Sequence, residues 1–369
     1  MINFDNRLKS LKDRRQGVDV RMAFESTARD SIGFDLRSKE NYENLRESSS
    51  IKYTIGAMAP VEKRSTEISI KEGKRIADSL IKSLKEYNIN ATSRLQGSVA
   101  LDIHIKGHSD VDMLIIITDT ETSELPRVYP QLHIPATDKR TMEDIVKDLR
   151  LTSEIILPKN FPQVNINNNG NKAIALEGGS LQRKVDIVPS CWYNTRMYQQ
   201  TKLEKDRGIK IYLKTDHELL ANLPFLHIDL ISNKDTLYSG NLRNCIRLMK
   251  NMVADMPDYK KRIAKKLSSY DLASIAYHMN EKLSLPYEMR IGLVEQIKEH
   301  LNHLSTNSYQ RNILHVPDKS RIIFNNEDKV KALEIIKEEF NDLATSIFND
   351  LSPFSHTYNA DVILNKRVA

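Results

Sequence analysis

The strongest hydrophobic pattern in the chain predicts a strand at 111–118. An almost unbroken apolar run follows the triplet Asp110-Val111-Asp112. Apolar residues on both faces of the strand indicate that it is buried within a sheet. Side chains alternate between the faces of a strand, so Asp110 and Asp112 lie on the same face. Two carboxylates at the start of a buried strand are costly unless a cation neutralises them. The pattern therefore predicts a divalent metal ion here.

Helical spacing predicts an amphipathic helix on each side of this strand. Apolar residues recur over 70–87, and Ser69-Ile70-Lys71-Glu72 has the form of a capping box at the start. This helix leads to a short predicted strand at 92–96. A second helix is predicted over 141–157, where Thr141 and Asp144 form another candidate cap. The proline-containing residues 119–140 between them are expected to be loop.

Polar turns divide the next part of the chain into three short strand-like pieces. They are separated by Asn-Asn-Gly and Gly-Gly turns. In the last piece, 183–190, Asp186 alternates with apolar neighbours and should point to the opposite face. Pro189 predicts that this strand ends there or lies at a sheet edge.

The remaining segments differ in character. Residues 1–50 are charge-rich and predict one or two helices that pack on another part of the chain. Residues 51–68 contain a glycine and a proline and predict an extended connection, whereas 239–351 is strongly helical. We place the boundary between two lobes at 200–235. The tail, 352–369, has few periodic signals and predicts a mobile end.

Composition fits an ordinary folded protein and excludes a disordered one. The 369 residues are 40% apolar and 28% charged, enough for two lobes with buried cores. The net charge of +6 suits either a polyanion-handling protein or solvated lysine-rich faces. Cys191 and Cys245 show no metal-like spacing, which favours a reducing, cytoplasmic location. No apolar signal segment is evident, and no window approaches the roughly 18 apolar residues of a membrane span.

Three acids and a small-residue turn together suggest chemistry on phosphates. Asp110 and Asp112 share one strand, Asp186 lies on another, and Gly97-Ser98 precedes the first pair. Carboxylates can hold divalent ions that clamp an attacking hydroxyl and a triphosphate. Small residues at a turn let backbone N–H groups approach phosphate oxygens. The alternative is a set of unrelated loop and surface acids, but an Asp-x-Asp between a Gly-Ser turn and a five-residue apolar run is uncommon.

These residues resemble the pattern of the polymerase β-like nucleotidyltransferase superfamily: Gly-Ser, then Asp-x-Asp, then a distant Asp. The resemblance covers about residues 92–190. It implies that Asp110 and Asp112 bind two Mg²⁺ ions, with Mn²⁺ as an alternative, and that Asp186 holds the ion that activates the acceptor hydroxyl. It also implies that Gly97 and Ser98 contact the triphosphate, with Ser98 at the β- and γ-phosphates.

A predicted helix at 239–255 carries a second signal. Arg243, Arg247 and Lys250 fall at i, i+4 and i+7 and form a basic stripe, for which a solvated helix face is the plain alternative. The Arg-Leu-Met-Lys block that ends at Lys250 is followed by Ser268-Ser269-Tyr270. This order resembles the helical lobe of cyclic GMP–AMP synthase.

The whole chain resembles the bacterial CD-NTases, the cyclic-oligonucleotide synthases of anti-phage (CBASS) signalling, and the segment Ile55–Pro60 adds light support. The resemblance implies that Lys250 and Ser269 contact the donor phosphates, that Arg247 belongs to the same nucleotide site, and that Tyr270 stacks on a base. An ordinary half-buried helix aromatic is the alternative for Tyr270.

The expected fold is α+β: a polymerase β-like nucleotidyltransferase core with a mixed sheet and flanking helices, a helical C-terminal lobe, and an active cleft between them. We expect the catalytic lobe with its N-terminal helices at 1–215 and the nucleotide-binding, oligoadenylate-synthetase-like lobe at 216–369. The implied activity is condensation of nucleoside triphosphates into a cyclic di- or trinucleotide second messenger. The alternatives are RNA tailing, nucleotidylation of a protein or small molecule, and a nucleotide-sensing scaffold that kept the fold.

The resemblance also implies partners: an effector that reads the cyclic nucleotide, and proteins that regulate the synthase or modify its C-terminus. Residues 365–369 are a candidate handle for such a partner, with a frayed end as the alternative. No cysteine-rich zinc insertion is present, so activation by double-stranded DNA through such an insertion is not expected. His104 and His108 lack a third ligand, so zinc is not expected either.

Overall fold

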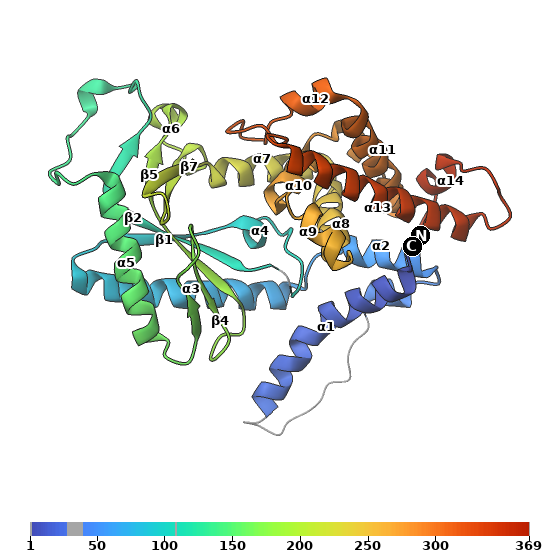
Figure 1. Cartoon of the computed structure of the whole chain (residues 1–369), viewed down its shortest axis with the longest axis horizontal. Helices are drawn as coiled ribbons and strands as arrows, with labels where there is room; N and C mark the ends of the chain where they lie inside the picture. The colour runs from blue at the N-terminus through green and yellow to red at the C-terminus, as the bar shows by residue number, and fades with distance from the viewer. Residues whose placement is uncertain (1, 28–39, 108, 369) are drawn as a thin grey trace. The chain divides into compact units, whose positions relative to one another are not determined.

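Residues 2–27, 40–107 and 109–368 are described by the structure, a computed structural model (Figure 1). They fold into two units that are not contiguous in sequence. Unit 1 contains Met1–Val61, Ile103–His108 and Ile231–Ala369, and unit 2 contains Glu62–Asp102 and Ser109–Leu230. This division differs from the expected ranges 1–215 and 216–369, because the N-terminal helices and residues 103–107 pack with the C-terminal helices.

Unit 2 is built on one mixed sheet, as the sequence predicts. Its neighbouring strands run in the order β1-β2-β5-β4-β3. Strand β6 pairs with the later part of β5, and β7 pairs with β6. The β2–β5 pair is parallel and every other pair is antiparallel. The strands are β1 (Ala91–Gln96), β2 (Val111–Ser123), β3 (Asn165–Asn167), β4 (Ile174–Glu177), β5 (Val185–Asn194), β6 (Gly208–Leu213) and β7 (Glu218–Asn222).

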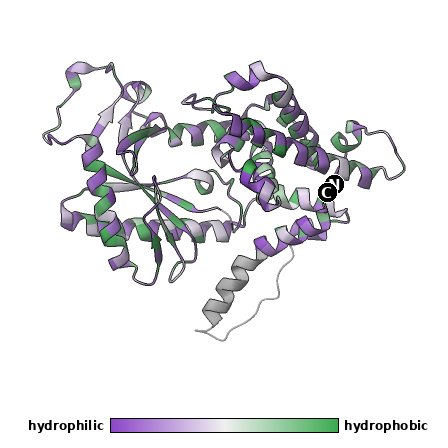
Figure 2. Ribbon diagram, in the orientation of Figure 1, coloured by the Kyte–Doolittle hydropathy of each residue, from purple (hydrophilic) through white to green (hydrophobic). Residues whose placement is uncertain are grey.

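Helices α3 (Lys63–Leu84) and α5 (Met142–Asn160) cover one face of this sheet. Alternate residues of β2 and β5, among them Met113 and Ile187, pack there against apolar residues of both helices. The opposite face carries a smaller buried cluster that includes Leu114 and Trp192. The central strands are largely green in the hydropathy colouring of Figure 2, as expected for a sheet buried on both faces. The shorter helices here are η2 (Lys85–Tyr87), α4 (Gly97–Ala100), η3 (Pro130–Leu132), α6 (Arg196–Thr201) and η4 (Glu204–Asp206).

Unit 1 is helical in its described part. Helix α2 packs on α1 and α8, and α11 packs on α13. Helix α7 (Pro224–Leu237) contains the division between the units. The other elements are α1 (Phe4–Thr27), η1 (Asn41–Asn44), α2 (Ser49–Met58), α8 (Asn241–Ala254), α9 (Asp258–Ala264), α10 (Ser269–Tyr277), η5 (Asn280–Leu283), η6 (Tyr287–Gly292), α11 (Leu293–Thr306), α12 (Ser308–Ile313), α13 (Glu327–Leu351) and α14 (Ala360–Leu364).

Two predictions near the start of the chain are wrong. The segment 51–68 is not an extended connection, because α2 runs through Gly56, whose missing side chain makes room for the Tyr42 ring. Ser69 does not cap a helix. It lies inside α3, and its hydroxyl donates to the Ser65 carbonyl 3.0 Å away. By contrast, the Thr141 cap is confirmed, because its hydroxyl accepts from the Asp144 N–H.

Two further predictions fail for tertiary reasons. Strand β5 continues through Pro189, whose missing N–H falls between the stretch of β5 that pairs with β4 and the stretch that pairs with β6. The C-terminal tail is not free, because α14 forms and Val368 is buried with its N–H bonded to the Glu288 carbonyl at 2.8 Å. Sheet register and burial by other segments decide both cases, and neither is visible in a local pattern.

Candidate active site

The predicted acids meet at one end of the β2–β5 pair. Asp112 and Asp186 are register partners on these parallel strands. Neighbouring strands lie about 4.8 Å apart and paired residues share a face, so the two half-buried carboxylates lie side by side. Asp110 precedes β2 by one residue, and the Val111 N–H donates to the Lys184 carbonyl at 3.0 Å, which fixes the start of β2 against β5.

The Gly-Ser turn abuts this pair from the other side of β2. Gln96 is the register partner of Asp112 on antiparallel β1, and Gly97 follows at once with a φ of +74° to begin α4. A Cβ atom on Gly97 would lie 2.2 Å from Oδ2 of Asp112. Only glycine tolerates both this backbone conformation and this approach. Ser98 follows, half-buried, in the same turn.

Burial and nearby negative charges raise the pKa values of Asp186 and Asp110 and so disfavour their ionised forms. Burial first, and then the charge of Asp110, raises the pKa of Asp186 to about 6, with Lys184 opposing the shift. Burial also raises the pKa of Asp110, again against Lys184. The pKa of Lys184 is raised, chiefly by Asp110, and its Nζ lies 3.2 Å from a Glu177 carboxylate oxygen. An added positive charge would favour the ionised form of both aspartates.

Lys184 is a site residue that the sequence analysis missed. Its signal was the i, i+2 spacing from Asp186, which places both side chains on the same face of the strand. In the structure this lysine is the compensating cation of the acid cluster.

The residues present fit a hard divalent cation. Oδ1 of Asp186 is buried and makes no hydrogen bond with any described residue. Carboxylate oxygens are the donors that Mg²⁺ and Mn²⁺ prefer, and substrate phosphates commonly complete the coordination shell. Within the described ranges, no three Asp, Glu, His or Cys side chains are gathered closely enough to hold an ion by themselves.

Two residues of the basic stripe of α8 are buried and Arg243 is half-buried, so the interpretation as a solvated face is wrong. Arg243 pairs with Asp235 at 2.8 Å. Arg247 and Lys250 are only 5% and 6% exposed. Nε of Arg247 donates to the Met58 carbonyl at 2.7 Å, and Nζ of Lys250 donates to the Ile103 carbonyl at 2.9 Å. These bonds stabilise unit 1, and nucleotide contacts by Arg247 and Lys250 stay predictions.

The Ser-Ser-Tyr segment lies at the start of α10. Ser268 caps this helix through Asp271, and Ser269 is exposed at its first position. Tyr270 is half-buried, and its hydroxyl donates to the Asp318 carboxylate. Burial and that carboxylate raise the pKa of Tyr270. The phosphate role of Ser269 and the stacking role of Tyr270 stay predictions.

Two further points concern zinc and membranes. His104 is buried in unit 1, whereas His108, its partner in the weak zinc pattern, lies outside the described residues. Among the helices of the described residues, none combines the length and apolar character needed to cross a membrane.

Comparison with known proteins assigns the family. No family model matches the chain. It is 38% identical over 364 residues to the cyclic dinucleotide synthase CdnE of Yersinia aleksiciae, covering 95% of this chain and 93% of that protein. The CdnE c-di-GMP synthase structure from Capnocytophaga granulosa aligns with a TM-score of 0.68 and 26% identity, covering 94% of this chain and 99% of that one.

A second CdnE c-di-GMP synthase, from Flavobacteriaceae sp., has the same fold. It aligns with a TM-score of 0.73 at 20% identity, covering 95% of this chain and 99% of that one. Near-complete coverage of a relative that is 38% identical extends the likeness beyond strands β2 and β5 to both units. The chain with its paired aspartates on β2 and β5 therefore belongs to the CD-NTase family, the nucleotidyltransferases that synthesise cyclic dinucleotides.

Proposed function

We propose that this chain condenses two nucleoside triphosphates into a cyclic dinucleotide and releases two pyrophosphates. The observation that carries the proposal is the register pair Asp112–Asp186 with Gly97 against it. The family relationship supports the same chemistry, and GTP is the first substrate to test because the Capnocytophaga relative is named a c-di-GMP synthase.

In the proposed reaction, Asp110, Asp112 and Asp186 would hold two divalent ions, with Mg²⁺ expected and Mn²⁺ as an alternative. Such ions would supply a lowered pKa of the acceptor hydroxyl and neutralisation of charge on the triphosphate. The hydroxyl oxygen forms a bond to the α-phosphorus of the donor while the bond to pyrophosphate breaks. A second transfer of the same kind closes the ring.

The protein contributes mainly positioning to this reaction. The parallel ladder fixes Asp112 beside Asp186, and the absence of a side chain on Gly97 leaves room for the Asp112 carboxylate and for phosphate oxygens near the turn. Fixed carboxylates and backbone N–H groups stabilise the transition state without reorganising during the reaction. Arg247, Lys250, Ser269 and Tyr270 are the proposed nucleotide contacts of the helical unit.

We place the product in a cytoplasmic signalling pathway of bacterial anti-phage defence. The Capnocytophaga relative is described as STING-associated. By analogy we expect a separate effector that binds the cyclic dinucleotide, and regulators that act on the synthase. The tail at 365–369 stays a candidate handle, although Lys366 pairs with Glu47 and Val368 is buried.

The test is mass spectrometry of the products formed from all four nucleoside triphosphates with Mg²⁺ or Mn²⁺. We expect a phosphatase-resistant cyclic dinucleotide from the parent protein and none from Asp110→Asn/Asp112→Asn. Asp119→Asn is the matched control, because Asp119 lies on the same strand and is exposed. A lengthened RNA or a labelled protein would support a different nucleotidyltransferase. Cyclic product from the double variant at the parent's rate would exclude these acids as the site.

A further inference from the structure

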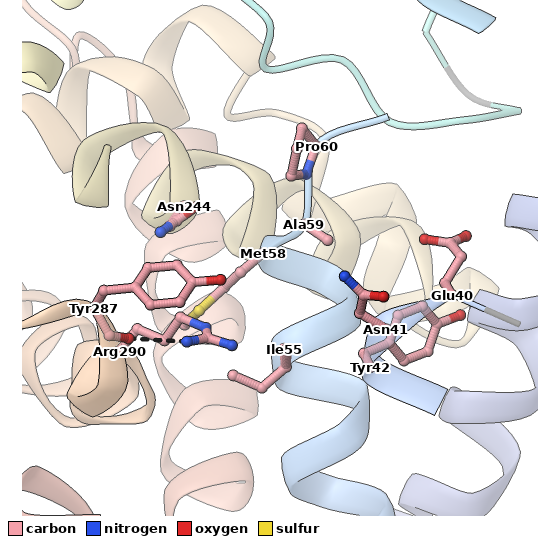
Figure 3. A pocket seen from close by; sticks show the side chains of 10 residues that line it. All are labelled: Glu40, Asn41, Tyr42, Ile55, Met58, Ala59, Pro60, Asn244, Tyr287 and Arg290. Atoms are coloured by element: carbon pink, nitrogen blue, oxygen red, sulfur yellow. Dashed lines mark hydrogen bonds between the residues drawn. The ribbon is translucent and has the colours of Figure 1, made fainter. Parts of the chain in front are cut away.

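A cavity within unit 1 has no role in the proposed reaction. Its volume is about 380 Å³, within the range of pockets that hold small molecules. Its walls come from η1, α2, α8 and η6 (Figure 3). The lining residues are Glu40, Asn41, Tyr42, Ile55, Met58, Ala59, Pro60, Asn244, Tyr287 and Arg290.

Arg290 supplies a positive charge to the wall of the cavity. The residue is 8% exposed, and its guanidinium donates to the Tyr287 carbonyl at 2.9 Å (Figure 3). No carboxylate of the described residues lies within ion-pair distance of it. Glu40, the acid of the lining, is held by Arg15 through bonds of 2.8 Å to each carboxylate oxygen. A nearly buried cation without an acid partner is costly, so the cavity favours an anion.

Three backbone carbonyls near the wall are already occupied. The Met58 carbonyl accepts from Arg247, and the Ala59 and Pro60 carbonyls accept from Arg15. The groups left to recognise a ligand are the Arg290 guanidinium, apolar surface, and neutral side chains such as Asn41 and Tyr42 that can donate hydrogen bonds. A cationic or acceptor-poor ligand gains little in such a pocket, whereas a carboxylate or phosphate gains charge-assisted hydrogen bonds.

An aromatic platform stands beside the charge. The Tyr287 ring is 71% exposed, and the Arg290 guanidinium lies 4.0 Å from its centroid. Ile55 and Met58 add an apolar wall from α2. The combination of a guanidinium fork, a flat ring and an aliphatic wall suits a molecule with one anionic group and a flat body.

We propose that this cavity is a binding site for a small carboxylate or phosphate that carries a flat ring. Arg290 binds the anionic group in bidentate fashion, and Tyr287 with Met58 holds the ring. The cavity shares no residue with the acid cluster, since all its lining residues belong to unit 1 and the aspartates belong to unit 2. The inference does not depend on the product of the synthase.

The test is calorimetric titration of the full-length protein with phenyl phosphate and, separately, with benzoate. EDTA is present so that the metal-free acid cluster repels both anions. We expect saturable binding of at least one probe, weakened about tenfold or more by Arg290→Gln. Arg290→Lys keeps the charge but loses the fork and should give an intermediate affinity. Binding of phenyl phosphate alone identifies a phosphate site, and binding of benzoate a carboxylate site.

Three controls keep the outcome interpretable. Tyr287→Phe keeps the ring and should bind like the parent, whereas Tyr287→Ala should bind weakly. Because the Tyr287 ring is exposed, its loss should not disturb folding. Comparison of the two Tyr287 variants therefore tests the proposal even if Arg290→Gln fails to fold. Arg262→Gln removes an exposed arginine outside the cavity and should change nothing. Absence of binding by both probes, or equal affinity in Tyr287→Ala and the parent, overturns the proposal.

Discussion

Replacement of Gly97 by alanine tests the proposed active site most directly. The added methyl group would start 2.2 Å from Oδ2 and 3.1 Å from Cγ of Asp112. Ordinary contact between a carbon and an oxygen atom needs more than about 3.2 Å, so the carboxylate must move by about 1 Å. The backbone also has a φ of +74°, a conformation that costs an L-residue about 1–2 kcal/mol.

The two effects should appear in different measurements. A displacement of about 1 Å at a catalytic group can cost about a hundredfold in rate, so we expect kcat to fall about a hundredfold. The backbone cost should lower the Tm by about 2–4 °C for each kcal/mol. Pyrophosphate release at saturating nucleotide measures the first effect, and thermal unfolding without nucleotide measures the second.

Gly178 provides the matched control in the same unit. Its φ is +71°, and a Cβ atom there would meet nothing within 4 Å. Gly178→Ala should therefore lose similar stability but keep its activity. If Gly97→Ala retained the activity of Gly178→Ala, the position of the Asp112 carboxylate would not matter for the reaction. The proposed role of the Gly97 turn would then be refuted.

Three further predictions concern the acids and the buried bases. Because the folded-state pKa of Asp186 is raised to about 6, protonation of Asp186 stabilises the metal-free protein at low pH, and this contribution is lost as the pH rises through 6. In the parent, the unfolding free energy should therefore decrease between about pH 4 and 6, and in Asp186→Asn this decrease should be smaller. Urea titration in EDTA measures it, and an unchanged pH profile in the variant would contradict the prediction. Lys250→Met leaves the buried Ile103 carbonyl without this donor, so the free energy of unfolding should fall by about 1–3 kcal/mol. Amide hydrogen exchange at 103–106 should become faster. A variant that loses activity but keeps its exchange protection would point to a phosphate contact alone. Arg150→Leu removes a fully buried guanidinium that pairs with Glu154 and donates to the Asn168 and Gly170 carbonyls. The free energy of unfolding measured in urea should fall by about 3 kcal/mol. A fall of less than about 0.5 kcal/mol would show that the site repacks.

Local sequence signals were enough to propose the candidate site without knowledge of the fold. The Asp110-Val111-Asp112 triplet and the Gly97 turn stood out because each is a signal contained in a few consecutive residues. The first places two acids at i and i+2 on one strand face, and the second places a glycine before a short helix. The β2 strand and the α5 helix with its Thr141 cap follow from equally local patterns. Such patterns survive folding because a strand face or a helix cap depends on its own neighbours in sequence.

The sequence alone could not place the basic residues of α8. Helical spacing put Arg243, Arg247 and Lys250 on one stripe, and solvation of that stripe was a reasonable alternative. Burial resulted from segments distant in sequence: Arg247 reaches Met58 of α2, and Lys250 reaches Ile103. A pattern of charges cannot reveal which distant carbonyls will accept their hydrogen bonds.

The sequence by itself determined the candidate site residues, the buried strand that begins between two of them, and the α+β class with its mixed sheet. Only the tertiary structure decided that Asp186 pairs with Asp112 across a parallel ladder, and that Lys184 compensates the cluster. It also decided that α1 and α2 belong to the same unit as the C-terminal helices, with α2 packed on α8 and α13. The physical reason is the separation in sequence over which each effect acts. Propensity and periodicity act over a few residues, whereas register, charge compensation and unit boundaries depend on burial between segments far apart in the chain.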